Sequence, residues 1–144
     1  MARYCAGMTA AGAGTSLRPI IGLLSTASVT GCIRMIGIWN TQGIACAYKV
    51  VSFTGGTAGA AQVEHKYRVN APPALCTAFG LWTADATIVE DTGYRVQAGA
   101  AVGSGAMFPF GDNGLETAVG STAGIGLIPI GTGQVCEVYI EWDE

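Results

Sequence analysis

Short runs in which apolar and polar residues alternate limit the fold of this chain more than any other feature. Residues 63–69 read VEHKYRV, and residues 135–142 read VCEVYIEW. A period of two places successive side chains on opposite faces and is typical of a half-buried β-strand. In the second run, Glu137 and Glu141 are expected to face water. The residues expected to face a core are Cys136, Val138, Ile140 and Trp142.

Further strand-like runs follow one another with turn signals between them. We expect strands at 17–24, 32–39, 44–53, 75–82, 94–102, 106–110 and 124–130. The intervening turn sequences are NTQG, TGGTAG, NAPP, EDTG, GDNG and GTGQ. Strands with such punctuation every ~8–12 residues are typical of an all-β fold, an antiparallel β-sandwich or barrel. Within this class we favour a jelly roll.

Two of the turn sequences are predicted to close β-hairpins. Asn113-Gly114 in GDNG suits a two-residue turn in which both central residues have positive φ. GTGQ at 131–134 is expected to join strand 124–130 to strand 135–142 as a hairpin. EDTG at 90–93 is expected to be a turn rather than an acid/base pair.

The chain is expected to divide into an extended N-terminal arm, residues 1–16, and a single β domain, residues 17–144. The first segment is rich in glycine and alanine and nearly uncharged, which is typical of a flexible arm. About 14 extended residues reach on the order of 45 Å, far enough to touch an adjacent subunit.

Charge is scarce along the whole chain. Only 12% of the residues are charged, against about 25% in an average soluble domain, and the net charge is −3. Because monomers rarely expose large apolar patches, this composition favours a homo-oligomer. The basic residues are scattered, so no nucleic-acid surface is predicted. We expect no membrane span, and folding in the cytoplasm, because the N-terminus lacks the long apolar stretch of a signal peptide.

Few residues could carry catalysis. His65 is the only histidine, and its place in an alternating strand favours half-buried packing. Gly126 and Gly131 have the spacing of a phosphate-binding loop, but no lysine follows them and the next segment alternates as a strand. We therefore predict no catalytic residue and no cofactor.

Metal ligands do not form a recognisable motif either. The five cysteines include no CxxC pair, so we expect buried free thiols. Asp112 and Asn113 lack the further ligands of a calcium loop. No metal site is predicted.

Aromatic residues could form a stacking platform for a sugar or a base, but core packing is favoured because each one ends or interrupts a predicted strand. These residues are Trp39, Trp82, Trp142, Phe108 and Phe110.

Three segments resemble small structural proteins of tailed bacteriophages: MARYCAGMTAAGAGTSLRP, GDNGLE and GTGQVCEVYIEWDE. In size and style the chain is most similar to capsid decoration, or cement, proteins. The resemblance implies a non-enzymatic homo-oligomer, a trimer or another symmetric cluster. It would lie on the outside of an icosahedral head, bridge major capsid protein subunits, and be made in the bacterial cytoplasm. In this setting Arg3, Tyr4 and Arg18 are the expected polar anchors of the interface.

Two alternatives stay open at this point. The first is a tail or head–tail component of the same kind of particle. The second is a carbohydrate- or receptor-binding β-sandwich in which Trp82 or Trp39 lines a groove.

Overall fold

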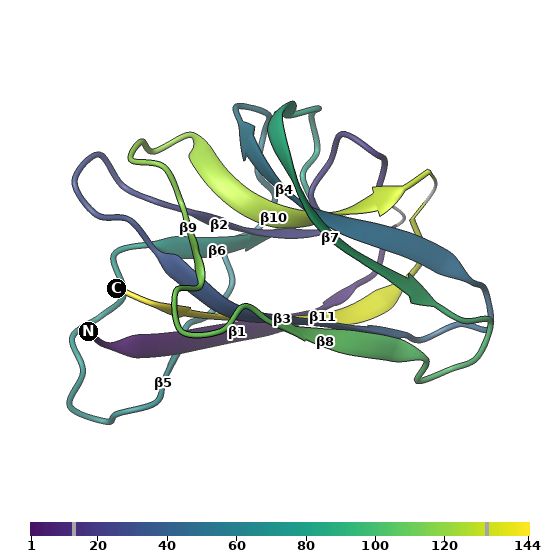
Figure 1. The fold of residues 1–144 in the computed structure, drawn as a ribbon, viewed down its shortest axis with the longest axis horizontal. Coiled ribbons are helices and arrows are strands. Elements are labelled where there is room, and N and C mark those ends of the chain that lie inside the picture. Colours follow the sequence, from purple (N-terminus) through teal and green to yellow (C-terminus); the bar gives the residue numbers. More distant parts are fainter. Residues whose placement is uncertain (13, 132) are drawn as a thin grey trace.

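Two antiparallel β-sheets lie face to face in this computed structural model, which describes residues 1–12, 14–131 and 133–144 (Figure 1). The first sheet has the strand order β5-β1-β11-β3-β8, with β9 also paired to β3. The second has the order β6-β2-β10-β4-β7. Neither sheet closes into a barrel, and the described residues contain no helix. The expected antiparallel all-β class is confirmed.

Strand bounds follow the predicted runs closely at some places and loosely at others. The first sheet contains β1 (Arg3–Ala10), β3 (Cys32–Asn40), β5 (His65–Lys66), β8 (Gly105–Pro109), β9 (Leu115–Glu116) and β11 (Cys136–Asp143). The second contains β2 (Ile21–Leu24), β4 (Cys46–Thr54), β6 (Thr77–Gly80), β7 (Thr87–Ala98) and β10 (Ala123–Ile130). The run 63–69 pairs only at its two β5 residues, where His65 is exposed rather than half-buried.

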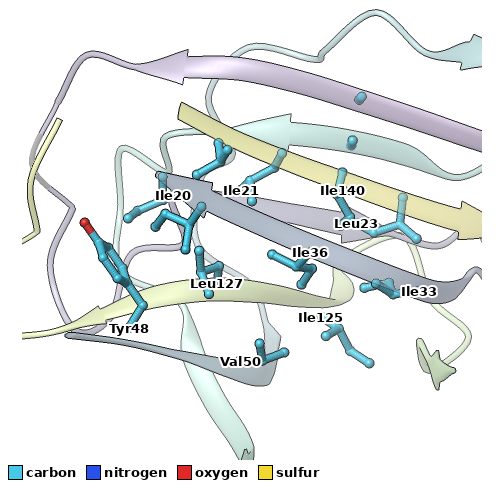
Figure 2. Packing of buried hydrophobic residues seen from close by; sticks show 14 of the residues in the cluster. Ile20, Ile21, Leu23, Ile33, Ile36, Tyr48, Val50, Ile125, Leu127 and Ile140 are labelled. Atoms are coloured by element: carbon cyan, nitrogen blue, oxygen red, sulfur yellow. The ribbon is translucent and has the colours of Figure 1, made fainter. Parts of the chain in front are cut away.

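The core lies between the two sheets and is built mainly from alternate residues of the long strands. The four β11 residues predicted to face it are all buried, none more than 2% exposed. Figure 2 shows isoleucine and leucine side chains from both sheets meeting in this layer, with Tyr48 at one end. The period-two alternation therefore placed the core face of the last strand correctly.

The outer face of the second sheet is covered by the chain itself. The Phe53 ring lies over three glycines on neighbouring strands, within 3.1 Å of the Cβ positions that Gly22, Gly124 and Gly126 lack. Trp82 meets Phe53 edge to face, with ring centroids 5.2 Å apart. A second cluster of buried apolar residues thus seals this side of the molecule.

The structure does not confirm the extended arm expected at residues 1–16. Residues 3–10 of that segment form β1, which lies between β11 and β5 and pairs with β11 over all eight of its residues. Tyr4, Ala6 and Ala10 are fully buried on the core side. Pairing with β11 on one side and β5 on the other makes β1 an inner strand despite its glycine- and alanine-rich composition.

Neither predicted hairpin forms. β10 belongs to the second sheet and β11 to the first, so the connection after Ile130 crosses between sheets. Thr132 of the predicted GTGQ turn lies outside the described residues. Around Asn113-Gly114, β8 and β9 both pair with β3 and not with each other, so this loop interrupts one edge strand. Gly111 and Gly114 supply the positive φ angles, 66° and 62°.

The predicted EDTG turn is a bulge inside β7. Asp91 Oδ1 accepts a hydrogen bond of 2.9 Å from the Gly93 amide, and Gly93 has a φ of 83°. Thr92 Oγ1 donates to the Val50 carbonyl on β4, at 2.7 Å. The turn chemistry is as predicted, but it adds residues to one strand of a pair instead of reversing the chain.

Candidate functional site: the outer face of the first sheet

The side of the first sheet that points away from the core is the candidate site, and we call it the outer face. It consists of the odd-numbered residues of β1 from Arg3 to Thr9 and of β11 from Glu137 to Asp143, with their neighbours on β3 and β8. These side chains alternate with the core residues of the same strands. They bring together residues from both ends of the chain.

An ionic network crosses one end of the outer face. Asp143 accepts hydrogen bonds from Arg3 Nε at 2.8 Å and from Arg34 Nε at 2.6 Å. Arg3 Nη1 also lies 3.2 Å from a Glu141 carboxylate oxygen. Glu141 and Asp143 are only 4% and 6% exposed, although they lie on the outward side. The hydrogen bond from Arg3 is the main cause that holds the pKa of Asp143 below its usual value.

Two tyrosine hydroxyls donate hydrogen bonds to the Glu141 carboxylate, at the oxygen that does not face Arg3. Tyr67 donates to Glu141 Oε2 at 2.6 Å and Tyr139 donates at 3.0 Å, and the two hydroxyls lie 2.8 Å apart. The hydrogen bond to Glu141 raises the pKa of Tyr67, and burial raises the pKa of Tyr139. Glu141 therefore lies on the predicted face but is enclosed by side chains instead of water.

The chain's single histidine lies opposite a cysteine on this sheet. Cys5 on β1 pairs with His65 on β5 and, on its other side, with Glu141 on β11. A nucleophilic thiol needs a base within hydrogen-bond reach and a group that orients the base. Among the described residues no hydrogen bond joins His65 to Cys5 or to a carboxylate, and Glu141 is engaged by Arg3, Tyr67 and Tyr139. The arrangement provides a Cys–His neighbourhood without the contacts of a catalytic triad.

The three expected interface anchors lie in different surroundings. Arg3 belongs to the ionic network of the outer face, with its side chain 45% exposed. Tyr4 is fully buried, stacks on Trp142 and donates to the Pro72 carbonyl at 3.0 Å. Arg18 pairs with Asp85 at 2.7 Å, between the loops before β2 and before β7. The structure brings only Arg3 to the outer face.

Most of the aromatic residues considered for a stacking platform are core residues. Trp142, Trp82 and Phe110 are 0%, 5% and 7% exposed, as core packing predicts. Trp39 is partly exposed on the outer face and covers Gly37, whose missing Cβ would lie 2.5 Å from the Trp39 ring. Of these rings, Trp39 is the one on the candidate site.

An open groove of about 830 Å³ lies beside the chain ends. Its lining is mostly apolar and includes Tyr4, Pro72 and Leu75, with Arg68 among the polar residues. The Glu144 carboxylate fixes one wall by accepting from the amides of Leu75 and Cys76, at 2.5 and 2.8 Å. The acidic C-terminal residues therefore make internal bonds instead of forming a solvated tail.

The remaining chemistry-bearing groups are dispersed. Burial raises the pKa of the Cys76 and Cys136 thiols to about 12, which keeps them protonated at neutral pH. The described residues include no group of three or more His, Cys, Asp or Glu side chains able to hold a metal ion. Gly126, the first glycine of the phosphate-loop spacing, lies inside β10 between β2 and β4.

Comparison with known proteins finds no matching family model, no matching curated protein and no matching solved structure. In the part of the chain that the structure describes, no helix is long and apolar enough to cross a membrane.

Proposed function

We propose that the two sheets form a jelly roll, and the pairing of the strands supports this. The first strand pairs with the last, β1 with β11, and the next pairs inward are β2 with β10, β3 with β8 and β4 with β7. Successive pairs alternate between the two sheets. This is the order of a long hairpin rolled into two four-stranded sheets, with β5, β6 and β9 as additions.

On this basis we propose a non-enzymatic structural protein of a tailed-bacteriophage virion, a capsid decoration protein. The observation that carries the proposal is the jelly-roll pairing order, because jelly rolls recur in viral capsid domains. The resemblance of three sequence segments to phage structural proteins points the same way. Among the described residues no hydrogen bond joins His65 to Cys5 or to a carboxylate, and this favours a structural role over an enzymatic one.

The proposed protein acts as a symmetric homo-oligomer, for which the resemblance implies a trimer, on the outside of the phage head. There it bridges major capsid protein subunits. Stabilisation of the head would come from buried area and main-chain contacts and not from chemistry.

Electron microscopy of virions tests the proposal. We expect antibodies against this chain to label the heads of particles from a phage that encodes it. Heads assembled without the chain should regain heat resistance when the purified protein is added. Labelling confined to tails would contradict the decoration role and support the tail or head–tail alternative. Unlabelled particles would overturn both.

The carbohydrate-binding alternative has one observation in its favour, since jelly rolls are also found in lectins. A groove lined by Trp82 is disfavoured, because Trp82 is packed against Phe53 and Phe79 and is 5% exposed. Trp39 is the aromatic residue through which this alternative can still be tested. Glycan binding that is lost in Trp39→Ala, with head binding absent in the wild type, would favour it.

A further inference from the structure

We infer that the outer face of the first sheet packs against the same face of a second copy of this chain, about a two-fold axis. This inference names the contact face of the homo-oligomer in the proposed function, and it gives that oligomer two-fold symmetry in place of the trimer that the resemblance implies. It does not depend on the virion role, because self-association can be measured on the purified protein.

The two sheets differ in what covers their outward sides. Phe53, Trp82 and neighbouring loops cover the second sheet. On the first sheet, Tyr67 crosses to Glu141 at one end, while Gly7, Thr9 and Met107 are exposed. A chain with 12% charged residues thus leaves one broad sheet face uncovered by its own described segments.

One row of residues across this face is complementary to itself. Gly7 on β1 pairs with Tyr139 on β11, Tyr139 with Gly37 on β3, and Gly37 with Met107 on β8. The row therefore begins at a glycine without a side chain and ends at a methionine that is 49% exposed. A two-fold axis parallel to the strands, between β11 and β3, places Met107 of each copy over Gly7 of the other. Such a contact is isologous and occurs twice.

The neighbouring row fits the same axis. It runs from Thr9 through Glu137 and Trp39 to Gly105. The axis places the position of Trp39 in one copy opposite that of Glu137 in the other, and the Trp39 ring extends over Gly37 in the first row. It also places Gly105 opposite Thr9, again a glycine against a side chain.

The charges of the face allow two copies to approach. Arg3 and Arg34 are already paired with Glu141 and Asp143, and both carboxylates are nearly buried in a single copy. Glu137, the remaining carboxylate, accepts a hydrogen bond of 2.7 Å from Thr9 Oγ1. Little additional charge has to leave water when the faces meet, and no block of like charge opposes itself.

The overlapping part of the face is at the lower limit of size for a specific dimer. The axis superposes β1, β11, β3 and β8, which have eight, eight, nine and five residues. At about 3.3 Å per residue and about 4.8 Å between strands, their footprint is on the order of 500 Å². Two copies would bury on the order of 1,000 Å², about the least that a specific interface needs.

Solution mass of the purified chain and its variants tests the inference. For the wild type we expect twice the 14.7 kDa of one chain in sedimentation or light scattering. Gly7→Met fills the position over which Met107 packs, and Met107→Gly removes the packing residue, so each should weaken association at least about tenfold. The double variant restores a methionine opposite a glycine and should recover the dimer.

Gly7→Met is compatible with the fold, since a Cβ at this position would have no neighbour closer than 3.4 Å. Met107→Asp places a charge in the contact and should weaken association. Val89→Asp, at an exposed position of β7 in the other sheet, is its matched control and should leave the dimer intact. Circular dichroism and urea midpoints identify any variant that is merely unfolded.

A monomeric wild type across the concentration series would overturn the inference, and so would a three-fold mass or an oligomer that Gly7→Met and Met107→Asp leave unchanged. The virion role is tested separately. It fails if the protein dimerises but antibodies against it do not label phage heads.

Discussion

Asp143 shows at the scale of one residue how the outer face is stabilised. Its carboxylate is almost inaccessible to water and accepts hydrogen bonds from Arg3 and Arg34, which come from two other strands. Removing one partner of a nearly buried ion pair leaves the other charges without compensation. This carboxylate therefore joins the two termini of the chain to the middle of the sheet.

Replacing Asp143 by Asn should lower the free energy of unfolding at neutral pH by about 2–3 kcal/mol, less than the ~3–5 kcal/mol of a fully buried pair because Arg3 reaches solvent. The folded-state pKa of Asp143 is depressed, so its contribution is present above the unfolded value of about 3.9 and is lost as the pH falls toward the folded value. Urea titrations from neutral to acidic pH should show a flatter pH dependence in Asp143→Asn than in the wild type.

Asp112→Asn is the matched control, because Asp112 is exposed on the loop between β8 and β9. Its free energy of unfolding at neutral pH should stay within about 0.5 kcal/mol of the wild type. Equal acid sensitivity of Asp143→Asn and the wild type would contradict the role given to the ion pair.

Tyr139 gives the opposite pH dependence. Its pKa is raised by burial, so the folded state keeps the hydroxyl neutral. The stability this provides is fully present below the unfolded pKa of about 10 and is lost as the pH rises beyond it. Tyr139→Phe should reduce the alkaline loss of stability, measured by urea unfolding at increasing pH. An unchanged alkaline loss in Tyr139→Phe would contradict this account.

Sequence reasoning at this scale identified which β11 residues face the core but not what surrounds Glu141. Alternation assigns a side chain to a face, and it says nothing about partners distant in sequence. Arg3 and Tyr67 reach Glu141 only because β1, β5 and β11 are neighbours in the sheet. That information is absent from the local pattern.

At the scale of elements, the second sheet depends on Trp82 to cover its glycine-rich outward side. We expect Trp82→Ala to lower the free energy of unfolding by about 3–5 kcal/mol, the usual cost of removing a buried large aromatic side chain. Trp39→Ala, at a partly exposed ring, should cost clearly less. Urea unfolding measures both. A Trp82→Ala protein as stable as the wild type would contradict the role of this ring in covering the second sheet.

The bulge in β7 also has a meaning at this scale. β7 is an edge strand of the second sheet, and its Asx-type turn at Asp91–Gly93 interrupts the regular row of backbone groups. Bulges of this kind hinder edge-to-edge pairing with other chains. Turn chemistry predicted the local conformation, and only the pairing with β4 reveals that it lies within a strand.

At the scale of the whole molecule, β11 is an inner strand although it ends the chain. It lies between β1 and β3 and supplies four buried side chains to the core. Deleting residues 136–144 should therefore leave the chain unfolded rather than give a shorter folded protein. Nuclear magnetic resonance spectra of the truncated chain should lose their dispersed amide signals, whereas deletion of Met1 alone should keep them. A well-dispersed spectrum of the truncated chain would contradict the central place of this strand.

The sequence predicts the fold class but not which strands pair with each other. Alternation and turn residues are local, whereas the pair β1–β11 joins residues near opposite ends of the chain. The two predicted hairpins were wrong for this reason. A tight turn fixes φ angles, but it does not determine whether the next strand joins the same sheet or the opposite one. The outer face as a site follows from this non-local pairing.

The two chain ends lie side by side at one corner of the molecule, where Ala2 and Glu144 exchange both backbone hydrogen bonds, at 2.9 and 3.0 Å (Figure 1). The polypeptide is thus nearly a closed ring. A short linker could join the ends, and new ends could be opened in an exposed turn such as 101–103 without loss of a strand. For the same reason, two proteins fused to this chain, one at each terminus, would lie next to each other at this corner.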